Sequence, residues 1–174
     1  MRKYIEPTWR INSVYAIQPE ELVREEIRGV IVDLDNTLIA WNQYEYTNEM
    51  RDWIDEVRAE GIQVYILSNN TQDRVSKVAD PLGVPFTSGA MKPTGNGFQR
   101  AIDVLNLPLE EIAVIGDQVM TDVIGANLKG LQSILVKPIA RNDNIYTQIN
   151  RLLERLAFKY LGINRHGDWG DTLE

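Results

Sequence analysis

Two aspartates, Asp33 and Asp35, follow a run of apolar residues and are separated by a single leucine. Carboxylates at the end of a buried strand are unfavourable unless something cationic meets them. A Mg2+ ion would supply that charge, and Asp117, which follows a later apolar run, offers a further oxygen ligand. Because oxygen ligands without competing nitrogen or sulfur favour magnesium over zinc, these residues predict a Mg2+ site.

The same residues suit stepwise transfer of a phosphoryl group. A metal-held carboxylate stays ionised and can attack phosphorus, while a second carboxyl group protonates the leaving oxygen and later takes a proton from water. Lys92, the Ser68 hydroxyl and the backbone amides near Asp35 would neutralise and orient the transferred group. The pattern therefore predicts hydrolysis of a phosphate ester.

Short apolar runs of the kind found in strands recur along the chain. They are typical of a parallel sheet covered on both faces, and they span residues 29–33, 62–67, 112–115 and 132–136, with 84–86 as a weaker fifth. Helical patterns over 48–60, 71–80, 94–105 and 121–129 alternate with them. The alternation predicts an α/β fold with a doubly wound, Rossmann-like parallel sheet. Ligands of such sheets bind at the carboxyl ends of the strands, where the polar residues fall.

These polar residues form four segments whose order resembles that of the four motifs of the haloacid dehalogenase (HAD) phosphatases. The likeness rests on Asp33-x-Asp35-x-Thr37, Ser68, Lys92-Pro93, and Gly116-Asp117 with Asp122. It implies that Asp33 is the nucleophile and Asp35 the acid and base.

The same resemblance implies the remaining roles. The metal ligands would be Asp33, Asp117 and the backbone carbonyl of Asp35, and the substrate phosphate would bind Ser68, Asn69 and Lys92. Thr37 and Asp122 would support the site.

A closer resemblance, to the YqeG-type phosphatases of HAD subfamily IIIA, spans nearly the whole chain. It rests on the stretch from Ile31 to Leu38, on Ser68-Asn69-Asn70, and on the Lys92-Pro93 and Gly116-to-Asp122 segments. That group is similar in turn to mitochondrial phosphatidylglycerophosphate phosphatases, which makes phosphatidylglycerophosphate the candidate substrate. This last step is an analogy between families and does not fix the substrate.

The spacing between the motifs leaves no room for a separate cap domain. We expect residues 1–174 to form one domain, with a capless HAD core at about 28–137 and a helical C-terminal extension at about 143–163. The site would be open, screened only by the segment 38–46, whose Trp41, Tyr44 and Tyr46 could contact substrate or pack. An open site also admits phosphoproteins and nucleic-acid ends as alternative substrates.

The composition of the chain limits which partners, nucleophiles and metal sites it could have. The chain has a formal net charge of -7, which disfavours nucleic acid as a partner. It contains no cysteine and a single histidine, so a cysteine nucleophile, thiolate metal sites and multi-histidine metal sites are excluded. The N-terminus does not resemble a signal peptide, which favours a cytoplasmic protein. A scaffold that keeps the fold without turnover remains an alternative, and the sequence indicates no partner protein.

The segment 145–161 permits two interpretations. It has an apolar helical stripe of Ile145, Ile149, Leu152, Leu153, Leu156 and Tyr160, and beside it a basic row of Arg151, Arg155 and Lys159. A helix that packs on the sheet with its charged face in water is the commoner outcome. The alternative is peripheral contact with an anionic membrane.

Overall fold

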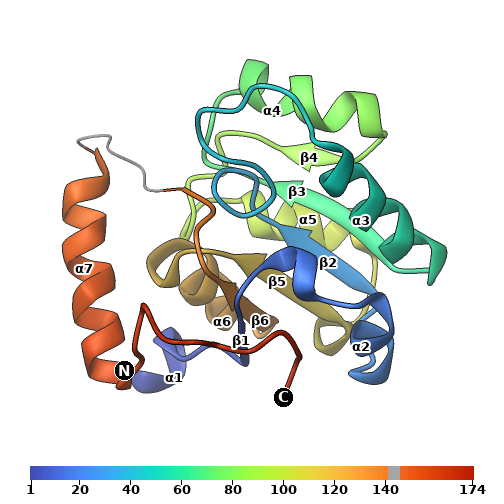
Figure 1. The fold of residues 1–174 in the computed structure, drawn as a ribbon. Helices are drawn as coiled ribbons and strands as arrows, with labels where there is room; N and C mark the ends of the chain where they lie inside the picture. The colour runs from blue at the N-terminus through green and yellow to red at the C-terminus, as the bar shows by residue number, and fades with distance from the viewer. Residues whose placement is uncertain (141–145) are drawn as a thin grey trace.

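A computed structural model describes residues 1–140 and 146–174, and its centre is a six-stranded parallel sheet (Figure 1). The strand order is β1-β6-β5-β2-β3-β4. The strands are β1 (Trp9–Ile11), β2 (Gly29–Val32), β3 (Gln63–Leu67), β4 (Phe86–Thr87), β5 (Ile112–Gly116) and β6 (Gln132–Val136). The predicted doubly wound α/β fold is confirmed.

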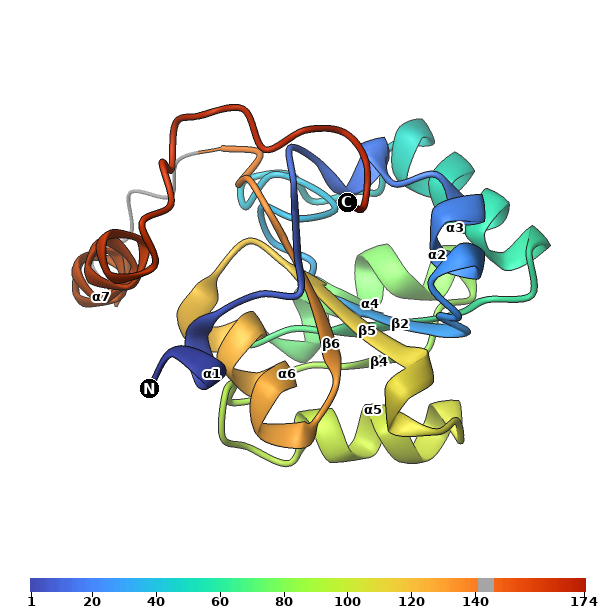
Figure 2. The same cartoon turned by 90° about the horizontal axis from the view of Figure 1, so that it is seen from below.

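Helices cover both faces of the sheet (Figure 2). On one face lie α2 (Pro19–Arg24), α3 (Asn48–Ala59) and α4 (Gln72–Ala79), and on the other lie α5 (Gly97–Leu105) and α6 (Ile124–Lys129). Short α1 (Arg2–Ile5) and long α7 (Tyr146–Leu161) complete the α-helices of the described residues. Single turns occur at η1 (Val14–Ala16), η2 (Asp80–Leu82), η3 (Leu109–Glu111) and the π-helix η4 (Val119–Val123).

Successive residues of the central strands fill two different cores, as the pleat of a strand requires. Val30 and Val32 of β2 pack with α2, α3 and α4, whereas Ile31 packs with Phe98 and Ala101 of α5. Both faces of β2 are therefore buried, and this is the reason why its sequence is apolar at every position.

The connections between the central strands contain no additional domain. From β2 to β3 the chain forms a loop and α3, and from β3 to β4 it forms α4 and η2. Two of these helices begin at threonine caps: the Thr47 hydroxyl accepts from the Met50 amide and the Thr71 hydroxyl from the Arg74 amide. The capless core predicted from the spacing is what the fold contains.

Some elements differ from the predictions. The sequence did not reveal β1, whose three residues include the exposed Arg10 and whose one partner among the described strands is β6. The helix predicted from residue 94 begins at Gly97, because Thr94 and Gly95 form a turn on the Met91 carbonyl. The helix predicted over 121–129 begins earlier, as the π-helix η4, before it becomes α6. Residues 143–145 of the predicted C-terminal extension lie outside the described part of the chain.

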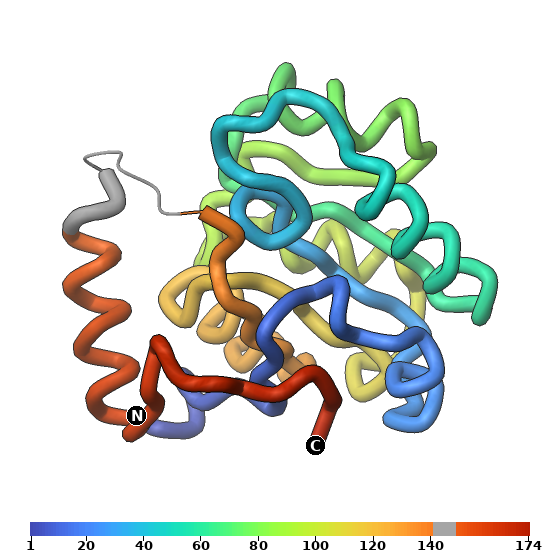
Figure 3. The backbone as a smooth tube through the Cα atoms, in the orientation of Figure 1, coloured from blue at the N-terminus to red at the C-terminus, as the bar shows by residue number. Residues whose placement is uncertain are grey.

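The C-terminal segment crosses the sheet edge beside β1 (Figure 3). The Asn12 amide donates to the Gly170 carbonyl at 2.9 Å, and the Leu173 amide donates to Glu21 at 3.0 Å. By contrast, α7 stands to one side of the body in both ribbon views (Figures 1 and 2). No helix among the described residues is both long and apolar enough to cross a membrane.

Candidate active site

The predicted site residues gather where the chain reverses its direction of travel across the sheet. From β2 the chain moves outward through β3 and β4, then returns to place β5 on the other side of β2. The carboxyl ends of β2 and β5 are therefore adjacent, and the Asp33 amide donates to the Ile115 carbonyl at 2.9 Å. Such a switch point is where open α/β sheets bind their ligands.

Three carboxylates meet at this point. Asp33 follows β2, Asp117 follows β5, and Asp122 lies in η4, and each offers an oxygen within 4.8 Å of those of the others. The Asp33 and Asp122 side chains are 11% and 2% exposed. Carboxylates this close and this little hydrated require compensating charge.

Lys92 supplies part of that charge. Its Nζ donates to Asp33 at 2.9 Å and to Asp122 at 2.7 Å, and its side chain is 3% exposed. Burial alone would lower the pKa of Lys92, but the attraction of Asp122 and Asp33 raises it above its ordinary value. Lys92 therefore remains a cation between two carboxylates.

One lysine does not balance three carboxylates. Burial raises the pKa of Asp33 to about 7, against the opposing effect of Lys92. Burial, followed by repulsion from Asp33 and Asp122, raises the pKa of Asp117 well above its ordinary value. This excess of negative charge is the feature that a divalent cation with oxygen ligands would neutralise, so the residues present fit the predicted metal.

Two neighbours fix the carboxylates of the β5 loop. The Thr37 hydroxyl donates to Asp117 at 3.0 Å, and the Gln118 amide donates to Asp122 at 3.2 Å. Gly116 allows Asp122 its position, because a Cβ at residue 116 would overlap the Asp122 carboxyl group. Asp122 thus bonds Lys92 on one side and the β5 loop on the other.

Ser68 and Asn69 lie at the end of β3. The Ser68 side chain is buried, and its hydroxyl accepts from the Asn70 amide at 3.1 Å. The Asn69 side chain accepts from the Lys92 backbone amide at 2.7 Å. Asn69 therefore positions the loop that carries Lys92.

Sequence reasoning assigned no role to the two partners of Asp35. The Arg74 guanidinium donates to one carboxylate oxygen at 2.9 Å, and the Asn70 side chain donates to the other at 2.8 Å. A signal was present for Arg74: it lies in α4 next to the buried stripe formed by Val75 and Val78, and a buried arginine needs a partner.

Arg74 also links the segment 38–46 to Asp35. Its guanidinium donates to the backbone carbonyls of Ala40 and Gln43 and lies 5.6 Å from the ring centre of Tyr44. Tyr44 is 71% exposed and Trp41 is 38% exposed, whereas Tyr46 packs against the core. Of the three aromatic residues, Tyr46 therefore has the packing role, while Trp41 and Tyr44 lie at the surface.

A second contact that the sequence did not reveal joins α7 to the site. The buried Glu154 carboxylate accepts from the Val119 amide at 3.1 Å and from the Met120 amide at 2.6 Å. These amides begin η4, which carries Asp122. Burial raises the pKa of Glu154 to about 7, although both backbone hydrogen bonds oppose the increase.

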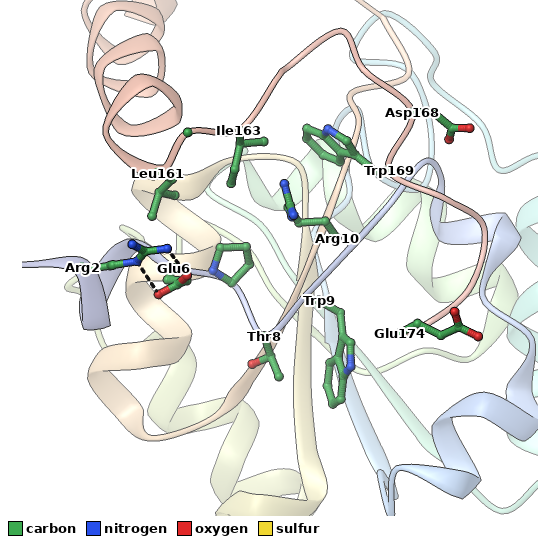
Figure 4. A pocket seen from close by; sticks show the side chains of 12 residues that line it. Arg2, Glu6, Thr8, Trp9, Arg10, Leu161, Ile163, Asp168, Trp169 and Glu174 are labelled. Atoms are coloured by element: carbon green, nitrogen blue, oxygen red, sulfur yellow. Dashed lines mark hydrogen bonds and ion pairs between the residues drawn. The ribbon is translucent and has the colours of Figure 1, made fainter.

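A cavity of about 390 Å3 lies elsewhere, between the N-terminal segment, the end of α7 and the C-terminal segment (Figure 4). Arg2 and Glu6 form an ion pair at its rim, at 2.9 Å. None of the carboxylates of the acidic cluster lines it. The acidic cluster at the strand ends is therefore separate from this cavity.

The fold and the site together define the class of this protein. Residues 39–128 match the model of the haloacid dehalogenase-like hydrolases. The chain is also 39% identical to a protein named probable phosphatase YqeG from Bacillus subtilis (strain 168), over 97% of this chain and 98% of that one. The chain belongs to the haloacid dehalogenase-like hydrolases and is a phosphatase of that family.

Two more distant similarities extend this comparison. The chain is 23% identical to phosphatidylglycerophosphate phosphatase 1, chloroplastic/mitochondrial, from Arabidopsis thaliana, over 92% of this chain but 49% of that protein. The cobalt-bound deoxy-D-mannose-octulosonate 8-phosphate phosphatase from Haemophilus influenzae superposes with a TM-score of 0.51 at 19% identity, covering 82% of this chain and 92% of that one. At that identity the structural likeness concerns the fold alone.

Proposed function

We propose that this protein is a Mg2+-dependent phosphate monoester hydrolase that works through an aspartyl phosphate on Asp33. The observation that carries the proposal is the meeting of Asp33, Asp117 and Lys92 at the switch point of the sheet, with negative charge in excess. A phosphate ester brings a phosphorus atom for Asp33 to attack and anionic oxygens for Lys92 to bind.

In the first step, an Asp33 oxygen forms a bond to phosphorus while the bond from phosphorus to the leaving oxygen breaks. Asp35 gives a proton to that oxygen, which departs as an alcohol. Both Asp35 oxygens accept hydrogen bonds in the structure, from Arg74 and Asn70. Asp35 must therefore take up a proton and release one of these contacts as substrate binds.

In the second step, water attacks the phosphorus of the aspartyl phosphate. Asp35, now ionised, takes a proton from that water, and the bond between phosphorus and Asp33 breaks. The products are inorganic phosphate and the starting carboxylate of Asp33. In both steps the positive charge of Lys92 and the hydrogen-bond donors around Ser68 stabilise the phosphoryl oxygens. These groups are already positioned before the substrate binds.

Asp33, Asp117 and the backbone carbonyl of Asp35 would hold the Mg2+ ion. When bound, Mg2+ supplies positive charge that keeps Asp33 ionised and stabilises the phosphoryl oxygens. Thr37 and Asp122 act through other residues of the site. Thr37 orients Asp117 by a hydrogen bond, and Asp122 holds Lys92 in place.

Phosphatidylglycerophosphate is the candidate substrate. The similarity to the Arabidopsis thaliana phosphatase supports it, although this chain spans about half of that protein. A site without a cap domain also leaves room for a phosphate that remains attached to a lipid surface. The proposal of the reaction does not depend on this substrate.

The test is release of inorganic phosphate by the purified full chain. An activated aryl phosphate and phosphatidylglycerophosphate in mixed micelles would each be tried with and without Mg2+. We expect release that requires Mg2+ and that is lost in Asp33→Asn. Asp73→Asn is the matched control, because Asp73 is an 81%-exposed carboxylate outside the site.

Each outcome has a definite meaning. Turnover by Asp33→Asn at the wild-type rate would overturn the aspartyl-phosphate mechanism. Hydrolysis of the aryl ester alone would support the reaction and reject the lipid substrate. Failure to hydrolyse either ester, together with no Mg2+ binding by calorimetry, would favour the non-catalytic scaffold.

A further inference from the structure

The apolar stripe of α7 faces solvent. Among the described residues of this helix, Glu154, Ala157 and Phe158 are buried, and the latter two pack against Val119, Val123 and Leu135. Every large residue of the predicted stripe that the structure describes is exposed: Ile149 by 74%, Leu152 by 56%, Leu153 by 38%, Leu156 by 55% and Tyr160 by 56%. The stripe therefore does not pack on the sheet, contrary to the commoner of the two interpretations.

The physical reason lies in the positions around the helix. At 3.6 residues per turn, the exposed stripe and the buried Glu154 lie on opposite sides of α7. The two hydrogen bonds that the Val119 and Met120 amides donate to Glu154 fix which side faces the body. A buried carboxylate thus occupies the packing face, and the apolar residues face outward.

The charges that α7 itself carries beside the stripe are all positive. Arg151, Arg155 and Lys159 follow one another at one edge of it, whereas the acidic residue of α7, Glu154, is buried on the far side. Arg155 and Lys159 are exposed, and neither forms an ion pair with another described residue. The chain as a whole has a formal net charge of -7, so this face is a local exception.

We infer that the outer face of α7, defined by Ile149, Leu152, Leu153, Leu156 and Tyr160 with the basic row, is a docking surface for an anionic lipid bilayer. A bilayer accepts both parts of the surface. The apolar stripe can enter the boundary between head groups and acyl chains, and the basic row can lie among the lipid phosphates. Tyr160 has the amphipathic ring that membrane interfaces favour.

A second copy of the chain is the competing occupant, and charge disfavours it. Two stripes in contact would bring two basic rows together at the edges of the seam. They would also bring together two bodies that each carry a net charge of -7. An anionic bilayer instead attracts the basic row, and because the acidic body lies on the opposite side of α7, salt screening weakens its repulsion from the lipid.

The surface lies close to the proposed site. The carboxylate of Glu154 bonds to the first amides of η4, and the stripe is on the other side of the same helix, a thickness of about 10 Å. Docking would therefore bring lipid head groups to the side of the molecule where η4 carries Asp122. This consequence rests on the proposed function, whereas docking itself does not.

Sedimentation of the full chain with vesicles tests the inference. Vesicles of equal parts phosphatidylglycerol and phosphatidylcholine would be compared with phosphatidylcholine alone, in low and high salt. We expect binding to the anionic vesicles that weakens with salt. Each basic residue near an anionic surface increases the partition coefficient onto that surface by about fivefold. The triple variant Arg151→Gln, Arg155→Gln and Lys159→Gln should therefore bind the anionic vesicles about a hundredfold more weakly.

Matched variants separate the surface from general effects. Leu152→Gln with Leu156→Gln should abolish vesicle binding, whereas Val104→Gln with Leu128→Gln, two similarly exposed apolar residues on α5 and α6, should retain it. The α7 variants should keep their circular dichroism spectra and their activity on a soluble aryl phosphate. Asp33→Asn should bind vesicles like the wild type, so failure of the proposed reaction would be distinguishable from failure of docking.

Two results would overturn the inference. One is absence of binding to anionic vesicles at low salt. The other is a dimer in solution that dissociates in Leu152→Gln with Leu156→Gln, without any vesicle binding, because the surface would then be an interface between copies.

Discussion

The Nζ atom of Lys92 lies 2.9 Å from a carboxylate oxygen of Asp33, although 59 residues separate the two in the chain. The contact joins the loop after β4 to the end of β2. The same Nζ atom lies 2.7 Å from Asp122, so one buried cation is shared between the proposed nucleophile and a supporting carboxylate. Removal of any member changes the charge balance of the other two.

Lys92→Met should impair both stability and activity. It leaves Asp33 and Asp122 buried without their cation, and breaking such a pair costs about 3 to 5 kcal/mol of unfolding free energy. Urea denaturation of the metal-free protein measures the loss. Lys77→Met is the control, because Lys77 is 62% exposed and pairs only at the surface.

A second substitution separates stability from catalysis at this position. Asp122→Asn in the Lys92→Met background removes one unpaired carboxylate, so we expect it to restore part of the lost stability without restoring turnover. Equal stability of the single and double variants would contradict the shared-cation arrangement.

Arg74→Ala should slow the hydrolysis of esters with poor leaving groups more than that of activated aryl esters. Arg74 positions Asp35, and a poor leaving group depends most on proton donation. We expect a decrease in kcat of roughly ten- to a hundredfold for an alkyl phosphate. Limited proteolysis should also cut the segment 38–46 faster, because Arg74 binds the Ala40 and Gln43 carbonyls.

Arg51→Ala is the control for this prediction, since Arg51 is 44% exposed and pairs with its sequence neighbour. A uniform decrease for both classes of ester would argue against an effect transmitted through Asp35.

Glu154 should make the protein less stable as pH rises from about 5 to 8. The folded-state pKa of about 7 exceeds the ordinary value of 4.5, so the native protein binds this proton more tightly than the unfolded chain does. The stabilisation is fully present below about pH 4.5 and is lost as pH passes about 7, a change on the order of 3 kcal/mol.

Urea denaturation of the wild type and Glu154→Gln at several pH values measures this effect. Asp33 and Asp117 contribute slopes of the same sign, so the informative quantity is the difference between the two proteins. Parallel curves would show that Glu154 titrates normally in the folded state.

Mg2+ affinity should increase as pH rises through about 7. The pKa values of Asp33 and Asp117 are raised in the metal-free protein, and both must lose their protons to act as ligands. Each released proton corresponds to about a tenfold gain in affinity per pH unit. Calorimetry in two buffers with different ionisation enthalpies counts these protons, and binding that is independent of pH between 6 and 8 would contradict the prediction.

Much of the fold and of the proposed site could be predicted from the sequence. The β2 and β5 runs contain no polar side chain, because each is covered on both faces. Polar residues directly after these runs, such as Asp33 and Asp117, must then lie at the strand ends. That inference needs only the periodicity and the rule that ligands bind at the carboxyl ends of parallel strands.

Other features depended on contacts between distant segments. Nothing near Asp35 in the chain indicates that Arg74 and Asn70 bind its two oxygens, and β1 becomes a strand only because β6 offers it an edge. The orientation of α7 is the clearest case. Its sequence shows an apolar stripe, but Glu154 accepts hydrogen bonds from the Val119 and Met120 amides, and these contacts turn the stripe toward solvent. A helix's pattern determines what its faces are made of, and only tertiary contacts determine which face is buried.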